Sequence, residues 1–132
     1  MSIEWLKAAK DDIYVLDDII DNVHLTNMIA FHAQQSIEKS LKAVIAFKEM
    51  NIPRIHSLNR LFNVVNIDLE IDIEIVNKLD KLYIDSRYPG DMGLLPYGKP
   101  TMDDAKEFYD FANNIFNRVC EILEVDINEV TK

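Results

Sequence analysis

The chain has little positive charge, and this shortage excludes one class of function. Its 132 residues hold 14 lysines and arginines against 23 aspartates and glutamates, which gives a formal net charge of −9. A protein that coats nucleic acid needs a basic surface, so the composition excludes that general role. It does not exclude a small cationic patch that binds one phosphate-bearing ligand.

Cysteine and long apolar runs are equally scarce. Cys120 is the one cysteine in the sequence, so no disulfide can form within the chain, and a reducing cytoplasm fits best. No apolar run approaches about 18 residues, and the N-terminus lacks the charged-then-apolar pattern of a signal peptide. We therefore expect a cytoplasmic protein with no membrane span. Hydrophobic residues make up 48% of the chain, which favours one globular domain over 1–132, with a core over about 2–123 and a tail over 124–132.

Glycine is rare and concentrated in one place. All three glycines and three of the four prolines lie in Tyr88–Pro100, which predicts one long loop. The glycine pattern GDMGLLPYG matches neither a phosphate-binding loop nor a dinucleotide fingerprint. The three histidines have no partner at i,i+4 and there is no cysteine pair, so neither a metal site nor a cofactor is predicted.

Apolar residues at steps of three and four predict helices along most of the chain. Five helices are expected. The first is Ser2–Asn22 with Ser2 as its N-cap, and the second is Ala30–Met50 with Asn27 as a candidate cap. A short third helix follows the cap Ser57, a fourth covers about Asp72–Arg87, and a fifth starts at Thr101 with a partial capping box. The predicted fold class is all-α, an antiparallel up-and-down four-helix bundle plus one short extra helix. The tail after Glu124 is expected to fray.

Two parts of this pattern need an interpretation. From Ile67 to Ile75 isoleucine and leucine alternate with acids, as in a half-buried strand, but no second alternating run exists to pair with it. We interpret the stretch as a linker to about Leu69, followed by the fourth helix. Apolar residues also extend beyond the predicted buried faces, and a homodimer would cover them. They are Trp5, Val15, Ile29, Phe47 and Phe111.

The second predicted helix has a polar row opposite its apolar face. His32, Gln35, Lys39 and Lys42 fall within a sector of roughly 80° when residues are placed at about 100° per step. In so acidic a chain, two lysines beside an amide and an imidazole form a candidate anion site. The alternative is a solvated face whose lysines balance neighbouring acids such as Glu38.

A second polar group lies where the fourth predicted helix ends. Tyr83 and Arg87 are one turn apart, and Tyr88 follows at the loop. A guanidinium can hold phosphate with two hydrogen bonds, and a tyrosine ring can stack on a base. Alternatively, Arg87 holds the long loop or pairs with Asp80, and Tyr83 belongs to the core. His56 either supplies a hydrogen bond to a ligand or stands at the entrance of the short helix.

Three segments together resemble the prokaryotic HEPN family. They are FHAQQSIEKSLKAVIAF, His56-Ser57-Leu58-Asn59-Arg60-Leu61 and YIDSRYPGD, within a resemblance that extends over about residues 2–123. Membership would imply an all-α up-and-down bundle, usually dimeric, often encoded beside a minimal nucleotidyltransferase. It would also imply nucleotide binding or metal-independent ribonuclease activity, frequently in toxin–antitoxin pairs.

One family motif is missing. Ribonuclease members carry an arginine followed four to six residues later by a histidine, whereas counting from Arg87 reaches Asp91, Met92 and Gly93. The remaining arginines fail the same test. An imidazole that could accept the proton of a ribose 2′-hydroxyl is therefore absent at the expected place. Folding would have to bring in His56 or His32 instead.

Three functional hypotheses follow. The leading one is a dimeric module that binds a nucleotide, or docks a minimal nucleotidyltransferase, without catalysis. In it Lys39, Lys42 and Arg87 contact phosphate, Tyr83 and Tyr88 contact a ring or fix the loop, and Gln35 and His56 supply hydrogen bonds. The second is a ribonuclease of divergent motif that uses His56 with Arg87. The third is an interaction subunit that only docks.

Overall fold

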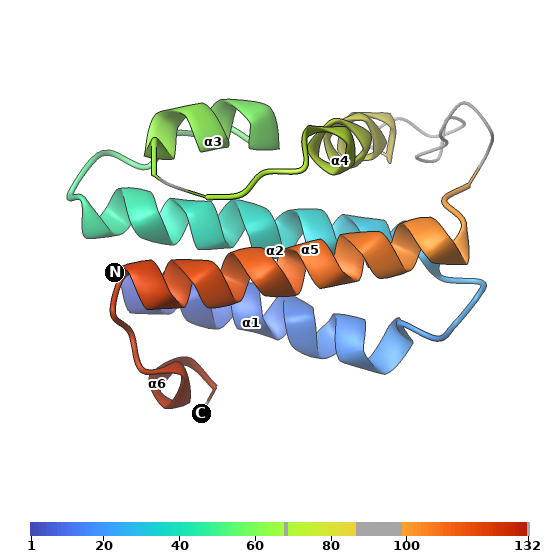
Figure 1. Ribbon diagram of the computed structural model, residues 1–132, viewed down its shortest axis with the longest axis horizontal. Helices are drawn as coiled ribbons and strands as arrows, with labels where there is room; N and C mark the ends of the chain where they lie inside the picture. Colours follow the sequence, from blue (N-terminus) through green and yellow to red (C-terminus); the bar gives the residue numbers. More distant parts are fainter. Residues whose placement is uncertain (68, 87–98, 132) are drawn as a thin grey trace.

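The structure, a computed structural model, describes residues 1–67, 69–86 and 99–131, and Figure 1 shows their arrangement. Within these ranges all regular secondary structure is helical, and the helices are joined by non-helical segments. The helices are α1 (Ser2–Ile19), α2 (Thr26–Phe47), α3 (Leu58–Val65), α4 (Ile73–Ser86), α5 (Met102–Ile122) and α6 (Ile127–Val130). The predicted all-α bundle is confirmed. No helix in the described ranges is long and apolar enough to cross a membrane.

Helix α2 is the centre of the bundle. It contacts α1, α3, α4 and α5, and Figure 1 shows α1 and α2 running in opposite directions beside α5. Helices α3 and α4 lie across the other side of this layer, with α4 seen nearly end-on. Because α2 is surrounded by other helices, many of its polar residues are also withdrawn from water, and these need partners inside the protein.

The hydrophobic core agrees with the predicted apolar faces. On α2 the predicted stripe is at most 2% exposed: Ala30, Ala33, Ile37, Leu41, Val44 and Ile45. Ile29 and Phe111, which the sequence assigned to the surplus, are buried within the single chain instead. Their burial corrects part of the argument for a dimer. Val15 and Phe47 remain exposed, and Trp5 is half-buried.

Three expectations about helix ends are wrong, and the one for the end of α2 has a backbone reason. Helix α2 ends at Phe47 rather than Met50, because Glu49 turns into the left-handed region at a φ of 57°. The Met50 and Glu49 N–H groups then bond back to the carbonyls of Ile45 and Ala46, which satisfies the end of the helix. At its start the N-cap is Leu25 and not Asn27. Helix α1 likewise has Met1 as its N-cap, not Ser2.

Side-chain caps position the later helices as expected. The Asp104 N–H donates to Thr101 Oγ1 and the Thr101 N–H donates to Asp104 Oδ2, each at 3.0 Å, so α5 starts with a complete capping box. At α4 the Asp72 carboxylate accepts the N–H groups of Glu74 and Ile75. The isoleucine–acid alternation is thus a linker followed by a helix, as interpreted.

The tail does not fray, contrary to expectation. Helix α6 packs against α1, with Val130 only 3% exposed. The Tyr14 hydroxyl donates to the Thr131 carbonyl at 3.1 Å, and Asp126 caps the short helix. One buried valine and one long-range hydrogen bond are enough to hold a segment that has no helical period of its own.

Cys120 lies on α5 and packs in the core, at 4% exposed. Burial raises the pKa of its thiol from an ordinary value of 9.0 to about 11. The thiol is therefore protonated in the folded chain at pH 8, and its ionisation lowers stability as the pH rises from about 9 to about 11. We expect a disulfide reagent to label the native chain at pH 8 at least tenfold more slowly than the urea-unfolded chain. Equal rates would show that α5 does not shield this residue.

Candidate functional site

The side of α2 that faces α3 and α4 carries a buried carboxylate with three donors. Glu38, whose side chain is 6% exposed, accepts hydrogen bonds from Lys42 Nζ at 2.9 Å and Gln34 Nε2 at 3.1 Å. His56 Nδ1 lies 3.2 and 3.3 Å from its two oxygens. This arrangement, with Gln35, is called the Glu38 cluster. These three partners take the place of water as hydrogen-bond donors to a carboxylate that is withdrawn from solvent.

Two glutamines join the cluster to the segment before α3. Gln35 Nε2 donates to Gln34 Oε1 at 2.7 Å. Gln34 Nε2 in turn donates to the backbone carbonyl of His56 at 2.9 Å. Both the ring and the backbone of His56 are therefore fixed by α2.

Four rings form a row beside the cluster. The Tyr83 ring centroid lies 5.4 Å from that of His56 and 6.4 Å from that of Phe31, with the Phe31 and Tyr83 planes 18° apart. Phe31 meets His32 edge-on, with their centroids 5.3 Å apart. Phe31 is 37% exposed and the His56 side chain 45%, so the row is open to solvent at both. A row of rings at these spacings can stack against flat ligands.

A second carboxylate lies on the α1 side of α2. Asp12, itself 7% exposed, accepts from His32 Nδ1 at 2.9 Å and from Lys39 Nζ at 2.8 Å. These bonds tie α1 to α2. They also mean that Lys39 and Lys42 each pair with an acid of this chain, as the alternative interpretation of the polar row expected.

Lys42 is the more deeply placed of the two lysines. Its side chain is 7% exposed, and its ammonium lies 5.7 Å from the centre of the Trp5 ring. The indole face adds a second attraction to the one from Glu38. Lys42 thus helps to hold Glu38, while Lys39, at 27% exposed, remains accessible to a ligand.

Asp80 caps α3 rather than facing the ring row. Its carboxylate accepts the N–H groups of Leu58 at 2.6 Å and Asn59 at 3.1 Å, together with the Ser57 hydroxyl at 3.1 Å. A carboxylate at a helix N-terminus satisfies donors that the helix cannot use. This contact fixes where α3 begins, and so where His56 lies.

Removing that cap is expected to weaken the fold measurably. Asp80→Ala should lower the free energy of unfolding by about 0.5–2 kcal/mol, the range for the loss of a side chain that bonds a helix N-terminus. Urea denaturation followed by circular dichroism measures the change. Asp103→Ala, at an exposed acid in the first turn of α5, serves as the control. A loss no larger than that of the control would contradict the capping role.

The structure brings together four of the predicted site residues. Gln35, Lys42, His56 and Tyr83 lie in or beside the Glu38 cluster. Lys39 belongs to the neighbouring Asp12 contact. Two further predicted site residues, Arg87 and Tyr88, lie outside the described residues.

Sequence reasoning missed the residues that hold this arrangement. They are Asp12, Phe31, Gln34 and, as an organising group, Glu38. The i,i+4 spacing of Glu38 and Lys42 is a signal that could have marked that pair. The contacts of Asp12 cross from α1 to α2, so no local pattern encodes them.

The histidine–carboxylate contact is the feature with chemical potential. A carboxylate that binds one imidazole nitrogen orients the ring, which leaves the second nitrogen for a ligand or a proton. His56 is half exposed, so a ligand can reach it. Among the described residues no group of three or more histidine, cysteine, aspartate or glutamate side chains is placed to hold a metal ion.

The fold and this face define an all-α domain with a polar, ring-bearing surface on its central helix. The family model of the HEPN domain matches residues 3–123, so the chain belongs to the HEPN domain family. A protein of Methanocaldococcus jannaschii named "Putative toxin MJ1304" is 26% identical over 133 residues, covering 91% of this chain and 86% of that protein. No solved structure matches the chain. The family resemblance found in the sequence is confirmed.

Proposed function

We propose that this chain is the HEPN module of a toxin–antitoxin-like pair and binds a nucleotide, free or within RNA, on the side of α2 that faces α3 and α4. The observation that carries the proposal is the convergence of His56 and Tyr83 on the Glu38 cluster. The rings of Tyr83 and Phe31 would stack on a base, and His56 and Gln35 would donate hydrogen bonds.

The charges on this face shape what it would bind. Lys39 and Lys42 are each paired with an acid, so the face offers shared rather than free positive charge. A ligand held mainly by stacking fits it better than one held by a row of phosphates. Arg87 and Tyr88, which follow α4 in the sequence, remain part of the proposal as the phosphate contact and a second ring.

The partner in this proposal is a minimal nucleotidyltransferase. Two observations support a paired system: the chain belongs to the HEPN family, and a relative is named as a toxin. Docking of a nucleotidyltransferase and binding of a nucleotide on α2 are compatible, since that partner works on nucleotides. Dimer formation is proposed as well, because Val15 and Phe47 are apolar side chains that stay exposed in the single chain and a second copy would cover them.

Calorimetric titration with ATP, GTP and a short single-stranded RNA tests the nucleotide part. We expect saturable binding by the wild-type chain, weakened at least fivefold by His56→Ala and by Arg87→Ala. His24→Ala is the matched control, because His24 is exposed and lies between α1 and α2, outside the cluster. Absence of heat from the wild-type chain at millimolar ligand would contradict the proposal.

A second candidate function has one specific observation in its favour. The Glu38 carboxylate holds His56 as a general base is held, so the chain would be a metal-independent endoribonuclease of divergent motif. His56 would take the proton of a ribose 2′-hydroxyl while its oxygen attacks the adjacent phosphorus. The 5′-oxygen would leave and be protonated by water, which yields a 2′,3′-cyclic phosphate and a 5′-hydroxyl.

Cleavage assays separate this candidate from the first. RNA cleavage that survives EDTA and falls about 10²–10⁴-fold in His56→Ala would support it, with His24→Ala retaining full activity. If the wild-type chain leaves RNA intact, both alone and with its nucleotidyltransferase, the ribonuclease candidate is contradicted and the non-catalytic nucleotide-binding module remains.

A further inference from the structure

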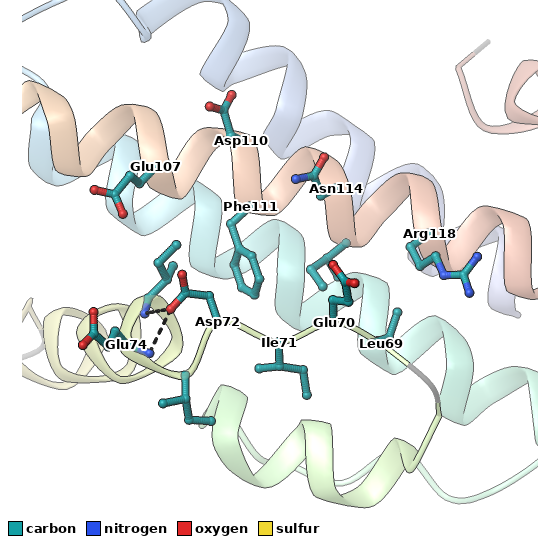
Figure 2. Close-up of a pocket in the computed structure, with 13 residues that line it drawn as sticks. Leu69, Glu70, Ile71, Asp72, Glu74, Glu107, Asp110, Phe111, Asn114 and Arg118 are labelled. Atoms are coloured by element: carbon teal, nitrogen blue, oxygen red, sulfur yellow. Dashed lines mark hydrogen bonds between the residues drawn. The ribbon is translucent and has the colours of Figure 1, made fainter.

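A groove runs between α5 and the segment that leads into α4, and Figure 2 shows the residues that line it. Its volume is about 1180 Å³. The segment contributes residues 69–75, and α5 contributes one side from Glu107 to Arg118. No residue of the Glu38 cluster or of the ring row lines it, so this surface is separate from the face proposed to bind a nucleotide.

The groove is apolar along its floor and acidic along its walls. The Phe111 ring points from α5 toward the segment, and Ile71 and Ile73 are 39% and 55% exposed. Five exposed acids line the walls: Glu70, Asp72, Glu74, Glu107 and Asp110.

No lysine or arginine among the described residues pairs with these acids. None of the five forms an ion pair with another described residue, and the one cation in the lining, Arg118, pairs with Glu121 on its own helix. Elsewhere in the described chain the buried acids Asp12 and Glu38 are each paired with a lysine. Asp72 accepts the backbone N–H groups that start α4, and the other four acids, beside exposed isoleucines, mark a surface that suits a cationic, partly apolar occupant.

The wall formed by residues 69–72 also offers backbone groups. Figure 2 shows this stretch running alongside α5 without helical turns. The Leu69 N–H bonds within the segment, to Ile67 O at 2.9 Å, and no backbone hydrogen bond joins Glu70 or Ile71 to another described residue. An extended peptide can pair with such a segment as an added strand.

We propose that this groove, called the α5 groove, docks an extended basic segment of a partner protein. The segment would lie beside residues 69–72, with apolar side chains on the exposed Ile71 and Ile73 and basic side chains toward the acids. From Glu107 to Arg118, α5 spans about 16 Å at roughly 1.5 Å per residue. About five residues of extended chain cover that length.

The charges favour a foreign segment over a second copy of this chain. Two copies meeting at this groove would bring two sets of five acids together, and like charges at an interface are strongly disfavoured. With a net charge of −9 the chain attracts basic partners in general. The groove adds the shape and apolar floor that make one contact specific.

An eight-residue peptide that alternates lysine and valine is the probe, titrated against the full chain by calorimetry. We expect one-to-one binding that weakens with added salt. In the variant Glu70→Lys with Glu107→Lys the affinity should fall at least tenfold. The matched control is Asp11→Lys with Asp18→Lys, which reverses two exposed acids on α1 and should change the affinity less than twofold.

Three results would overturn the proposal. They are absence of binding at millimolar peptide, equal weakening by the two reversed pairs, and unchanged affinity for a peptide methylated on alternate backbone nitrogens. Sedimentation supplies a further outcome: a dimer of the wild-type chain that dissociates only in Glu70→Lys with Glu107→Lys would assign the groove to a second copy instead. Circular dichroism of both reversed pairs checks that the fold is kept.

Discussion

Glu38→Ala is expected to lower the free energy of unfolding by about 3–5 kcal/mol, the cost of leaving a buried charge without its partner. The carboxylate holds Lys42, Gln34 and His56 at once, and Lys42 is 7% exposed. Once the acid is gone, the ammonium loses its ion pair and keeps its contact with the Trp5 ring. Urea denaturation of the variant and the wild-type chain in the same buffer measures the loss of stability.

A double change shows whether the loss comes from the stranded lysine. Glu38→Gln with Lys42→Met removes both charges and keeps their volumes, so it should cost clearly less than Glu38→Ala. Glu74→Ala, at an exposed acid in the first turn of α4, should change stability by no more than about 0.5 kcal/mol. A cost below about 1 kcal/mol for Glu38→Ala would show that the cluster does not hold the fold.

Tyr83→Ala is expected to give the largest loss of nucleotide affinity. The ring lies between those of His56 and Phe31, at 5.4 and 6.4 Å, so its removal interrupts the ring row at its centre. Stacking contributes about 1–3 kcal/mol per base, which corresponds to a loss of roughly 5- to 150-fold in affinity. Calorimetry with the nucleotide that binds the wild-type chain most tightly measures it.

Two further variants define the role of the ring. Tyr83→Phe keeps the stacking surface and should retain most of the affinity. Phe47→Ala removes an aromatic ring that is 57% exposed at the far end of α2, and should leave binding unchanged. If Tyr83→Ala remains folded and binds as well as the wild-type chain, the ring row is not a ligand surface.

The sequence predicted the parts of the fold that local patterns encode. The apolar stripe of α2, the capping box at Thr101 and the start of α4 after Asp72 all follow from periodicity and cap chemistry. The end of α2 could not be read in this way, because Glu49 has no local preference for the left-handed turn it makes. The docking of α6 likewise depends on a contact between Tyr14 and Thr131, two residues that are 117 positions apart in the chain.

The same division holds for the candidate site. Gln35 and Lys42 share a helix face, so their proximity was predictable from spacing. The approach of His56 and Tyr83 was not, because it depends on how α3 and α4 pack on α2. The sequence offered pairing of the lysines as an alternative but could not identify the partner of Lys39, since Asp12 comes from another helix. Pairing changes the expected ligand from an anion bound by charge to a ring bound by stacking.

Nuclear magnetic resonance of the imidazole rings tests the nucleotide proposal most directly, because the chain has only three histidines. On addition of an adenosine dinucleotide we expect the His56 ring signals to shift saturably and those of His32, at the other end of the ring row, to shift less. The signals of His24 should stay in place. Unchanged signals at millimolar ligand, or equal shifts of all three rings, would contradict a nucleotide site on α2.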